Sequence, residues 1–330
     1  MSRLEIEQLA DRLLPVIRKK PGAFIEVEAL ARTLKADRLS VERAVAALAS
    51  WDYKLKKRGD SVAFVEAPDT LTATEIAFAL KTKSIGRHIF AYKAVKSTND
   101  LAAEMAESGQ PEGTIVVADQ QTKGRGRLGR QWHSPEGTGI YLSIILKPDF
   151  VTEMAPAVSI MTAVALADTL VRYNPGEVRI KWPNDVLISG RKVAGILTEL
   201  SAEREKINHI IIGVGVNVNQ AVGDFPEELR QRATSLRRSL KKKVRRVELL
   251  QGFLVNFEKE YAGYKRYRLK KSHSKIRKYS SLIGHEITLR SGKHEETGMA
   301  VDIDSDGRLV LERDGVKSLI NAGEVTIVKK

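Results

Sequence analysis

The chain has 330 residues, of which 42% are hydrophobic and 29% charged, values typical of a globular protein with two or three domains. It has no cysteine, which excludes disulfides, thiolate catalysis and cysteine-bound zinc, and its six histidines are too scattered for a dedicated metal site. The net charge is +14, and we expect a cytoplasmic protein without membrane contact, because the sequence shows no secretory leader and no apolar run long enough to span a bilayer.

Residues 1–66 are predicted to form a winged helix-turn-helix. Residues 30–34 and the stretch that follows Ser40 indicate two short helices around a tight turn, with Ser40 as the N-cap of the second helix. Residues 53–66 then predict two short strands that would form a basic wing. Apolar residues of the second helix recur at helical spacing and predict one buried face, formed by Val41, Ala44, Val45 and Leu48.

The exposed face of that second helix offers few side chains that could read DNA bases. Arg43 is its one obvious base reader, whereas the neighbouring basic residues are better suited to phosphates. Two interpretations therefore stay open, a winged helix that binds DNA and one that no longer reads it. The predicted DNA contacts are Arg38, Ser40, Arg43, Lys54 and Lys56.

Three further segments follow. Residues 67–83 are predicted as a linker and a short helix, which Thr72 and Glu75 begin with a capping box. Residues 84–278 mix strands with helices, including a buried helix over 155–170, and predict an α+β catalytic domain. Residues 279–330 contain short segments in which apolar and polar residues alternate, spaced roughly 8–12 residues apart. This pattern predicts short strands that form a small β-barrel.

Positive charge is concentrated in one part of the chain. Between Arg237 and Lys278, 16 lysines and arginines stand against three glutamates. Such a segment is either the solvated face of helices or a surface that attracts nucleic acid, a membrane surface or an acidic protein. The sequence alone leaves both interpretations open.

The segment GRGRLGRQW, residues 124–132, combines glycine and arginine and is called the Gly-Arg loop below. It contains the G-x-G-x-x-G pattern of dinucleotide-binding proteins, but that motif needs a strand directly before it and a helix directly after it. The residues directly before and after the Gly-Arg loop do not predict these two elements. A nucleic-acid-binding loop is a second interpretation. We favour a third, a loop that closes over a small anionic substrate, because glycine lets the chain fold down and arginine donates to anions.

Four other motifs accompany this loop in a fixed order: Ser97-Thr98-Asn99, KWPND at 181–185, GRKVAGIL at 190–197 and GVGVN at 213–217. With the Gly-Arg loop, this order resembles the biotin protein ligases, in particular the bifunctional form that also represses the biotin operon. The resemblance covers nearly the whole chain and is loosest at the N-terminus. It implies a winged helix-turn-helix, a mixed-sheet catalytic domain similar to class II aminoacyl-tRNA synthetases, and a C-terminal SH3-like barrel.

The resemblance also implies a reaction in two steps. The carboxylate of biotin attacks the α-phosphate of ATP, with Mg²⁺, to give biotinyl-5′-AMP and pyrophosphate. A lysine of the biotin carboxyl carrier protein, a subunit of acetyl-CoA carboxylase, then displaces AMP. In repressor relatives the adenylate-bound form dimerises on operator DNA, so a homodimer and an operator are further expected partners. A lipoate-type ligase and a DNA-binding regulator without ligase activity remain as alternatives.

Elementary electrostatics explains why such a site needs cations. Two unit charges about 4 Å apart repel by roughly 4 kcal/mol at an effective dielectric constant near 20, and here a carboxylate approaches a polyphosphate. Arginine, lysine and Mg²⁺ offset this repulsion. No metal site made by the protein alone is expected. By the resemblance, the catalytic residues are Lys192, Arg125, Lys181 and Asp185.

The resemblance assigns the remaining ligand contacts as follows. Biotin contacts are Ser97, Thr98, Asn99, Gln121, Arg125, Gly126, Arg127, Lys192 and Gly195. ATP contacts are Arg127, Trp132, Lys181, Asn184 and Asn217. Two of these contacts have ordinary structural alternatives, Ser97 as a helix cap and Trp132 as a core residue. The catalytic candidate Asp185 could likewise be only part of a turn.

Overall fold

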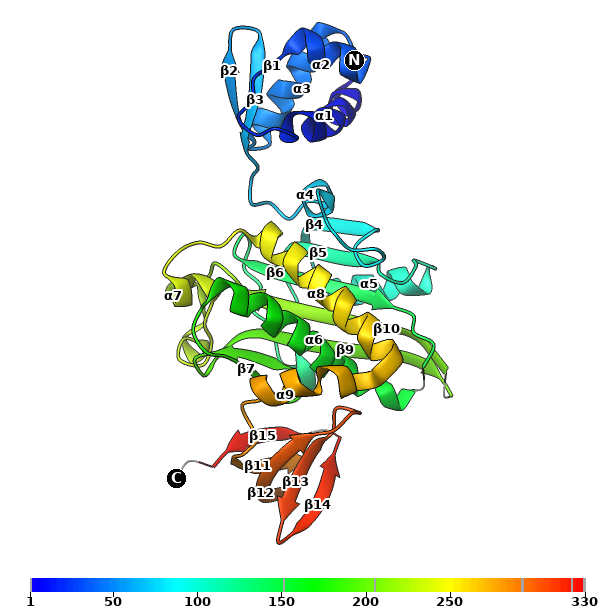
Figure 1. The fold of residues 1–330 in the computed structure, drawn as a ribbon, viewed down its shortest axis with the longest axis vertical. Coiled ribbons are helices and arrows are strands. Elements are labelled where there is room, and N and C mark those ends of the chain that lie inside the picture. Colours follow the sequence, from blue (N-terminus) through cyan, green and yellow to red (C-terminus); the bar gives the residue numbers. More distant parts are fainter. Residues whose placement is uncertain (1, 151, 205, 292–293, 322, 329–330) are drawn as a thin grey trace. The chain divides into compact units, whose positions relative to one another are not determined.

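The computed structural model describes residues 2–150, 152–204, 206–291, 294–321 and 323–328. The chain divides into two compact units, Met1–Thr70 and Leu71–Lys330, whose elements are labelled in Figure 1.

The first unit combines helices with a small antiparallel sheet. Its helices are α1 (Arg3–Arg18), α2 (Val27–Leu34) and α3 (Arg38–Ser50). Its sheet has the order β1-β3-β2, with β1 (Ile25–Glu26), β2 (Lys54–Arg58) and β3 (Ser61–Glu66). The predicted apolar face of α3 is buried, since Val41, Ala44 and Leu48 are all 0% exposed. It packs against α1 and α2 to form the core of this unit.

The start of α3 differs from the prediction. Its N-cap is Asp37, whose carboxylate accepts from the Ser40 backbone N–H at 2.9 Å and from the Ser40 hydroxyl at 2.5 Å. The cap predicted at Ser40 was therefore wrong, because an aspartate three residues earlier satisfies the same helix-end donors. Ser40 is 6% exposed, which leaves little surface for the DNA contact predicted for it.

The second unit is built on a seven-stranded mixed sheet of order β4-β5-β6-β10-β9-β8-β7, in which β4 and β5 are parallel and the other neighbours antiparallel. The mixed central sheet was predicted correctly. Its strands are β4 (Ile89–Val95), β5 (Ile115–Gln121), β6 (Gly139–Leu146), β7 (Val178–Lys181), β8 (Asp185–Ile188), β9 (Arg191–Glu203) and β10 (Lys206–Asn217).

Helices cover both faces of this sheet. The long helices α6 (Ala155–Leu170) and α8 (Arg246–Tyr267) lie side by side on one face, and α5 (Thr98–Glu107) packs on the other (Figure 1). Because side chains alternate along a strand, Ile144 of β6 joins the large core under α6 and α8, whereas Ile145 packs against α5. The shorter helices are α4 (Ala73–Ala77), α7 (Leu236–Leu240) and α9 (His273–Tyr279).

Short 3-10 turns occur in the loops. Their bounds are Arg127–Gly129, Thr152–Met154, Val171–Tyr173, Val222–Asp224, Glu227–Leu229 and Arg268–Ser272. The capping residue of α4 is Thr72, which accepts from the Glu75 N–H at 3.2 Å as the sequence predicted.

The C-terminal part is a five-stranded antiparallel sheet of order β14-β13-β12-β11-β15. Its strands are β11 (Glu286–Ser291), β12 (His294–Ile303), β13 (Leu309–Arg313), β14 (Val316–Ile320) and β15 (Glu324–Ile327). Inward residues such as Leu289 and Leu311 belong to the same core as the seven-stranded sheet. The buried Trp182 indole also donates to the Gly307 carbonyl at 2.8 Å, which ties the KWPND turn to this sheet.

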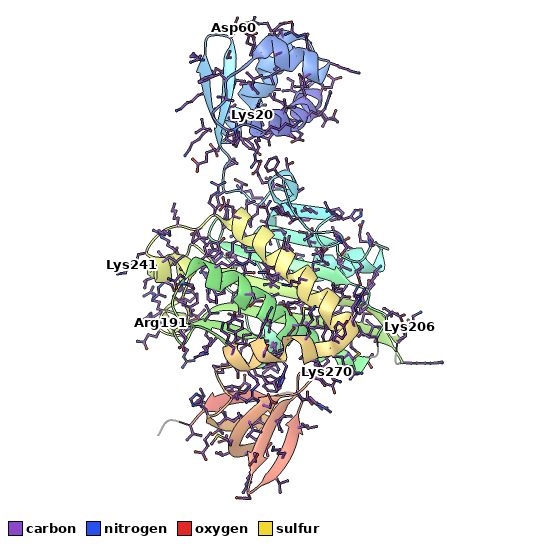
Figure 2. The ribbon with its side chains drawn as sticks, viewed as in Figure 1. Lys20, Asp60, Arg191, Lys206, Lys241 and Lys270 are labelled. Atoms are coloured by element: carbon purple, nitrogen blue, oxygen red, sulfur yellow. The ribbon has the colours of Figure 1, made fainter. Side chains whose placement is uncertain are left out.

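The basic segment from Arg237 to Lys278 contains many ion pairs. Arg246 is 2.5 Å from Asp119, and Lys275 is 2.6 Å from Asp168. Carboxylates distant in sequence thus neutralise part of the block, while Lys241 and Lys270 remain exposed at the surface (Figure 2). No helix among the described residues is long and apolar enough to cross a membrane.

Gly252 offers a test of packing in α8. A Cβ at this position would meet only Thr169 Cγ2, at 3.6 Å, which is an ordinary contact. We expect Gly252→Ala to raise the free energy of unfolding by about 0.5–1 kcal/mol, because glycine weakens a helix interior. Urea denaturation would measure this effect, and a lower midpoint would show that α6 and α8 pack more tightly than the structure shows.

Candidate active site

One pocket of about 580 Å³ lies on the α5 side of the sheet, between the Gly-Arg loop, the KWPND turn and β15. All residues predicted to contact biotin or ATP line it, although they come from five separate stretches of sequence. The structure therefore brings these side chains together, and their individual roles remain predictions.

The floor of the pocket is made of glycines at matching positions on adjacent strands. Gly215 of β10 faces Gly195 of β9, and the Trp132 indole lies over both. A Cβ at Gly215 would be 2.4 Å from indole Cε2, and one at Gly213 would be 2.3 Å from Asn99 Oδ1. Only a residue without a side chain lets Trp132 and Asn99 approach the sheet this closely.

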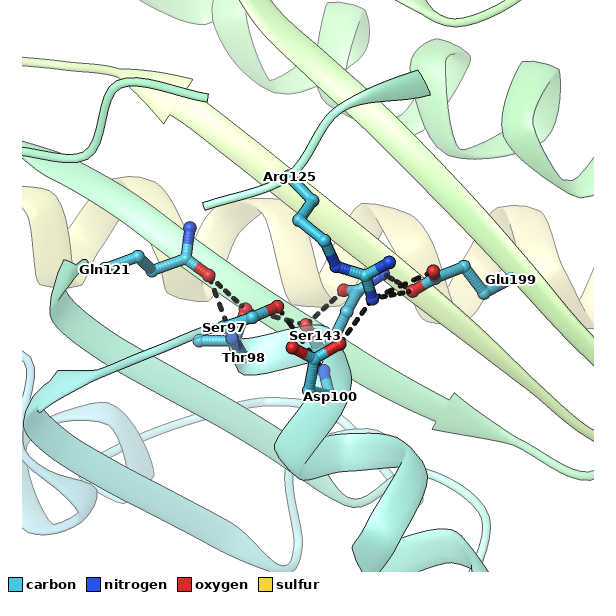
Figure 3. A network of polar contacts seen from close by, with 8 residues as sticks. Ser97, Thr98, Asp100, Gln121, Arg125, Ser143 and Glu199 are labelled. Atoms are coloured by element: carbon cyan, nitrogen blue, oxygen red, sulfur yellow. Dashed lines mark hydrogen bonds and ion pairs between the residues drawn. The ribbon is translucent and has the colours of Figure 1, made fainter. Parts of the chain in front are cut away.

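A wall of neutral polar groups stands at the start of α5 (Figure 3). Ser97 is the N-cap and accepts from the Asp100 N–H at 3.4 Å. Gln121 Oε1 accepts from the Thr98 N–H at 2.8 Å and from its hydroxyl at 3.1 Å. The Gln121 amide donates to Ser134 at 3.1 Å, so this side chain is fixed at both ends.

The wall continues through buried side chains toward Arg125. The Ser143 hydroxyl is 2.8 Å from Thr98 Oγ1 and 2.6 Å from Asn99 Oδ1. Asn99 Nδ2 donates to Glu199 at 2.6 Å, and Glu199 also accepts from the Arg125 guanidinium. Five of the predicted biotin contacts thus belong to one continuous network of hydrogen bonds and ion pairs (Figure 3), namely Ser97, Thr98, Asn99, Gln121 and Arg125.

Cationic side chains gather at the opposite side of the pocket. Lys192 Nζ is 2.7 Å from Asp185 Oδ1 and 5.3 Å from the centre of the Trp132 ring. Lys181, at the end of β7, lines the same pocket. The pairing of Asp185 with Gly195 in the β8–β9 register places the carboxylate beside the pocket floor.

Arg127 of the Gly-Arg loop reaches across to the KWPND turn. Its guanidinium donates to Asn184 Oδ1 at 3.1 Å, and the Asn184 amide donates to the Ile196 carbonyl at 2.9 Å. Burial lowers the pKa of Arg127, and the nearby carboxylate of Asp185 opposes this shift. A half-buried cation whose hydrogen-bond partner is a neutral amide retains its charge for an anion.

Two further predicted residues differ in their contacts. Asn217 is 5% exposed and accepts a hydrogen bond from Gln220 at 3.4 Å. Trp132 Nε1 is buried without a hydrogen-bond partner among the described residues. An unpaired buried donor that borders a pocket is suited to an acceptor on a ligand.

Sequence reasoning missed several residues of this site. Asp100, Ser143 and Glu199 hold the predicted ones in place, and Glu324 of β15 pairs with Arg130 of the Gly-Arg loop. Ser143 alone left a local signal, as a polar residue inside the apolar run GIYLSIIL at 139–146. The others are charged residues in ordinary surface patterns.

Two family models match the chain. The model described as "Biotin/lipoate A/B protein ligase family" matches residues 91–217, and "Biotin protein ligase C terminal domain" matches residues 282–328. The first range spans most of the seven-stranded sheet, from within β4 to the end of β10, and the second spans the C-terminal sheet.

Individual relatives show the same similarity over longer stretches. The "Bifunctional ligase/repressor BirA" of Bacillus subtilis is 36% identical over 312 residues, covering 94% of this chain and 96% of the relative. The "Biotin--[acetyl-CoA-carboxylase] ligase" of Mycobacterium tuberculosis is 33% identical over 235 residues, 69% of this chain and 85% of the relative.

A solved structure agrees in fold. The biotin protein ligase from Aquifex aeolicus in complex with biotin and ATP superposes with a TM-score of 0.64 and 31% identity. It covers 74% of this chain and is itself covered completely.

Proposed function

Because the chain belongs to the biotin protein ligase family, with bifunctional ligase/repressors among its relatives, we propose that the pocket joins biotin to ATP and passes biotin to a protein. The observation that carries this proposal is the division of the pocket. Neutral hydrogen-bonding groups line one side, around Thr98 and Gln121, and Lys192 and Arg127 lie on the other.

The first step forms a mixed anhydride. A carboxylate oxygen of biotin attacks the α-phosphorus of ATP, the bond to the β-phosphate oxygen breaks, and pyrophosphate leaves. Lys192 and Arg127 lower the repulsion between the two anions, and they act best where water is excluded. The neutral wall suits the uncharged ring system of biotin, and Trp132, which lines the pocket over Gly195 and Gly215, would cover the ligand.

The second step transfers biotin to the acceptor lysine. Its ε-amine attacks the acyl carbon, the bond to AMP breaks and the nitrogen loses a proton. Asp185 is the carboxylate we propose for that proton, because it borders the pocket and is held by Lys192 at 2.7 Å. Asp185→Asn should slow transfer from preformed adenylate to the acceptor, measured by mass spectrometry. Unchanged transfer would leave Asp185 with a structural role only.

The site fits a magnesium ion that arrives with the nucleotide. Among the described residues no cluster of three carboxylates or histidines could hold a metal. Mg²⁺ prefers one or two carboxylates together with phosphates and water, and Asp185 supplies such a carboxylate at the pocket. When bound, the ion would neutralise phosphate charge, while Lys181 and Asn184 position the phosphates.

Pyrophosphate release from ATP tests the proposal directly. We expect release with biotin and none with lipoate, followed by biotin transfer to a biotin carboxyl carrier protein. Pyrophosphate release with lipoate and not with biotin would indicate a lipoate ligase, which belongs to the other branch of the family. No release with either acid would leave a DNA-binding regulator as the function of the chain.

The first unit supports a repressor role in addition. We propose that it is a winged helix-turn-helix, with α3 as the recognition helix and β2–β3 as the wing. The adenylate-bound protein would bind an operator as a homodimer in the cytoplasm.

The predicted DNA contacts differ in whether they are already paired. Arg43 and Lys56 are exposed. Arg38 forms ion pairs with Glu42 at 2.9 Å and with Asp60 at 2.7 Å. Lys54 forms an ion pair with Glu66 at 2.6 Å. These pairs leave Arg43 and Lys56 as the stronger candidates for DNA contact.

The salt dependence of DNA binding distinguishes the roles proposed for Lys56 and Arg43. Lys56→Ala should weaken binding to all sequences and reduce the slope of log K against log salt by about 1, because one phosphate contact is lost. Arg43→Ala should instead reduce the preference for the operator. Lys206→Ala, an equal charge change in the second unit, is the control. Equal effects of all three variants would contradict this role for the first unit.

The finer domain assignment belongs to the same proposal. Residues 1–66 would form the winged helix and 67–83 the connection. Residues 84–278 would form a catalytic domain similar to class II aminoacyl-tRNA synthetases. Residues 279–330 would form an SH3-like barrel, which the order and lengths of β11 to β15 support.

A further inference from the structure

Arg125 and Arg127 lie two residues apart in the Gly-Arg loop, yet their surroundings differ. The Arg125 guanidinium pairs with Asp100 of α5 and lies 3.0 Å from Glu199 Oε1 of β9. Arg127 donates a hydrogen bond to the neutral oxygen of Asn184, and the nearby carboxylates of Asp185 and Glu324 make no ion pair with it among the described residues. Two carboxylates more than offset the charge of Arg125, so its surroundings are net negative and unsuited to a second anion.

Glu199 connects Arg125 to the polar wall. Glu199 accepts hydrogen bonds from Arg125 and, at 2.6 Å, from Asn99 Nδ2. This contact directs Asn99 Oδ1 toward Ser143, whose hydroxyl donates to it at 2.6 Å. Ser143 in turn contacts Thr98 at 2.8 Å, and Thr98 holds Gln121. A single carboxylate thus fixes both the start of the Gly-Arg loop and the orientation of the wall (Figure 3).

The fold leaves this arrangement little freedom. Glu199 projects from the same face of β9 as Gly195, two alternations further along the strand. Gly213 presses against Asn99, since a Cβ there would be 2.3 Å from Asn99 Oδ1. Asn99 therefore has its amide fixed by Glu199, its oxygen by Ser143 and its position by the backbone of β10.

We propose that Glu199 is a positioning residue that, with Asp100, anchors Arg125 and so couples the Gly-Arg loop to the polar wall. This rests on the proposed function, in which the wall receives biotin. Arg125 then contributes to biotin affinity through the position of the loop, and its charge does not act on the phosphate in the adenylation step. This differs from the catalytic role that the sequence resemblance implies for Arg125.

Steady-state kinetics of pyrophosphate release test the proposal. Glu199→Gln keeps the size of the side chain but removes the charge that holds Arg125. At saturating ATP we expect the KM for biotin to rise about tenfold, because the variant loses one charge-assisted hydrogen bond. The kcat should stay within about twofold of wild type. Arg125→Gln should show the same split. Glu203→Gln, an exposed residue on the same strand, should behave as wild type.

The double variant distinguishes coupling from a general structural effect. If Glu199 acts through Arg125, Glu199→Gln added to Arg125→Gln should change the KM for biotin by less than about twofold further. Two independent tenfold effects that multiply would overturn the proposal. A kcat loss of about tenfold or more in Arg125→Gln, with unchanged KM, would also overturn it and restore a catalytic role.

Limited trypsin digestion provides a readout that does not need activity. Without biotin, the anchored Gly-Arg loop should be cleaved at its arginines several times more slowly in wild type than in Glu199→Gln. Equal cleavage rates would contradict the anchor even if the enzyme is active. A wild type that releases no pyrophosphate with biotin but shows this difference would instead refute the proposed function and leave the anchor standing.

Discussion

Lys192→Ala should reduce biotin-dependent pyrophosphate release by about 10²–10³-fold, the usual loss when one preorganised charge donor is removed from an active site. Lys192 Nζ lies 2.7 Å from Asp185 and over the Trp132 ring, at the cationic side of the pocket. Its removal takes away a charge that offsets the repulsion between carboxylate and phosphate. It also leaves Asp185 without its cation, so the pocket gains net negative charge.

The effect should fall on kcat more than on the KM for biotin, because the charge matters most when the two anions meet. Lys192→Arg should recover part of the rate, since the charge returns with different geometry. Arg191→Ala is a matched control, because this neighbour in the chain is exposed and lies outside the residues that line the pocket. A Lys192→Ala enzyme within tenfold of wild type would refute the central role of this cation.

Gly215→Ala should cause the second large loss, although it removes no functional group. A methyl group at this position would lie 2.4 Å from two atoms of the Trp132 indole, so the ring must move into the pocket. A displacement of about 1 Å near reacting groups lowers rates by roughly 10²-fold. We expect kcat/KM to fall by about this factor for both biotin and ATP, while the circular dichroism spectrum stays that of wild type.

Trp132→Ala provides the complementary variant for this prediction. It removes the clash, so Gly215→Ala should cost far less in the Trp132→Ala background than in wild type. Gly252→Ala is the control for a glycine replacement that meets no close neighbour. Wild-type kinetics of Gly215→Ala would show that the indole is not held against β10. A multiplicative loss in the double variant would contradict the steric explanation.

Much of the second unit could be predicted because its elements have strong local patterns. The apolar run over 155–170 became α6 with the same bounds, and the mixture of strands and helices predicted over 84–278 became a seven-stranded mixed sheet with helices on both faces. Period-two alternation and buried apolar runs depend only on neighbouring residues, so they are visible in one sequence. The first unit was predicted less well at its helix boundary, since Asp37 and Ser40 are both good N-caps and only the backbone decides between them.

The chemistry of the pocket is visible in short motifs of the amino-acid sequence. Ordered motifs of glycine, arginine, lysine and asparagine carry the resemblance that implies a site where one anion reacts with another, and all residues predicted to contact biotin or ATP line one pocket. Motif residues are recognisable because their type and spacing are unusual in any fold.

Which of those charges remain available to a ligand depends on contacts that form in the folded chain. Arg125 and Arg127 lie two residues apart in the same motif, but folding pairs Arg125 with Glu199 and Asp100. Arg127 instead donates to the neutral Asn184, with the carboxylate of Asp185 nearby and no ion pair to Arg127 among the described residues. The basic segment from Arg237 to Lys278 is likewise neutralised in part by carboxylates from distant positions, such as Asp119 and Asp168. Electrostatic energy depends on distance in space, and the sequence records only distance along the chain.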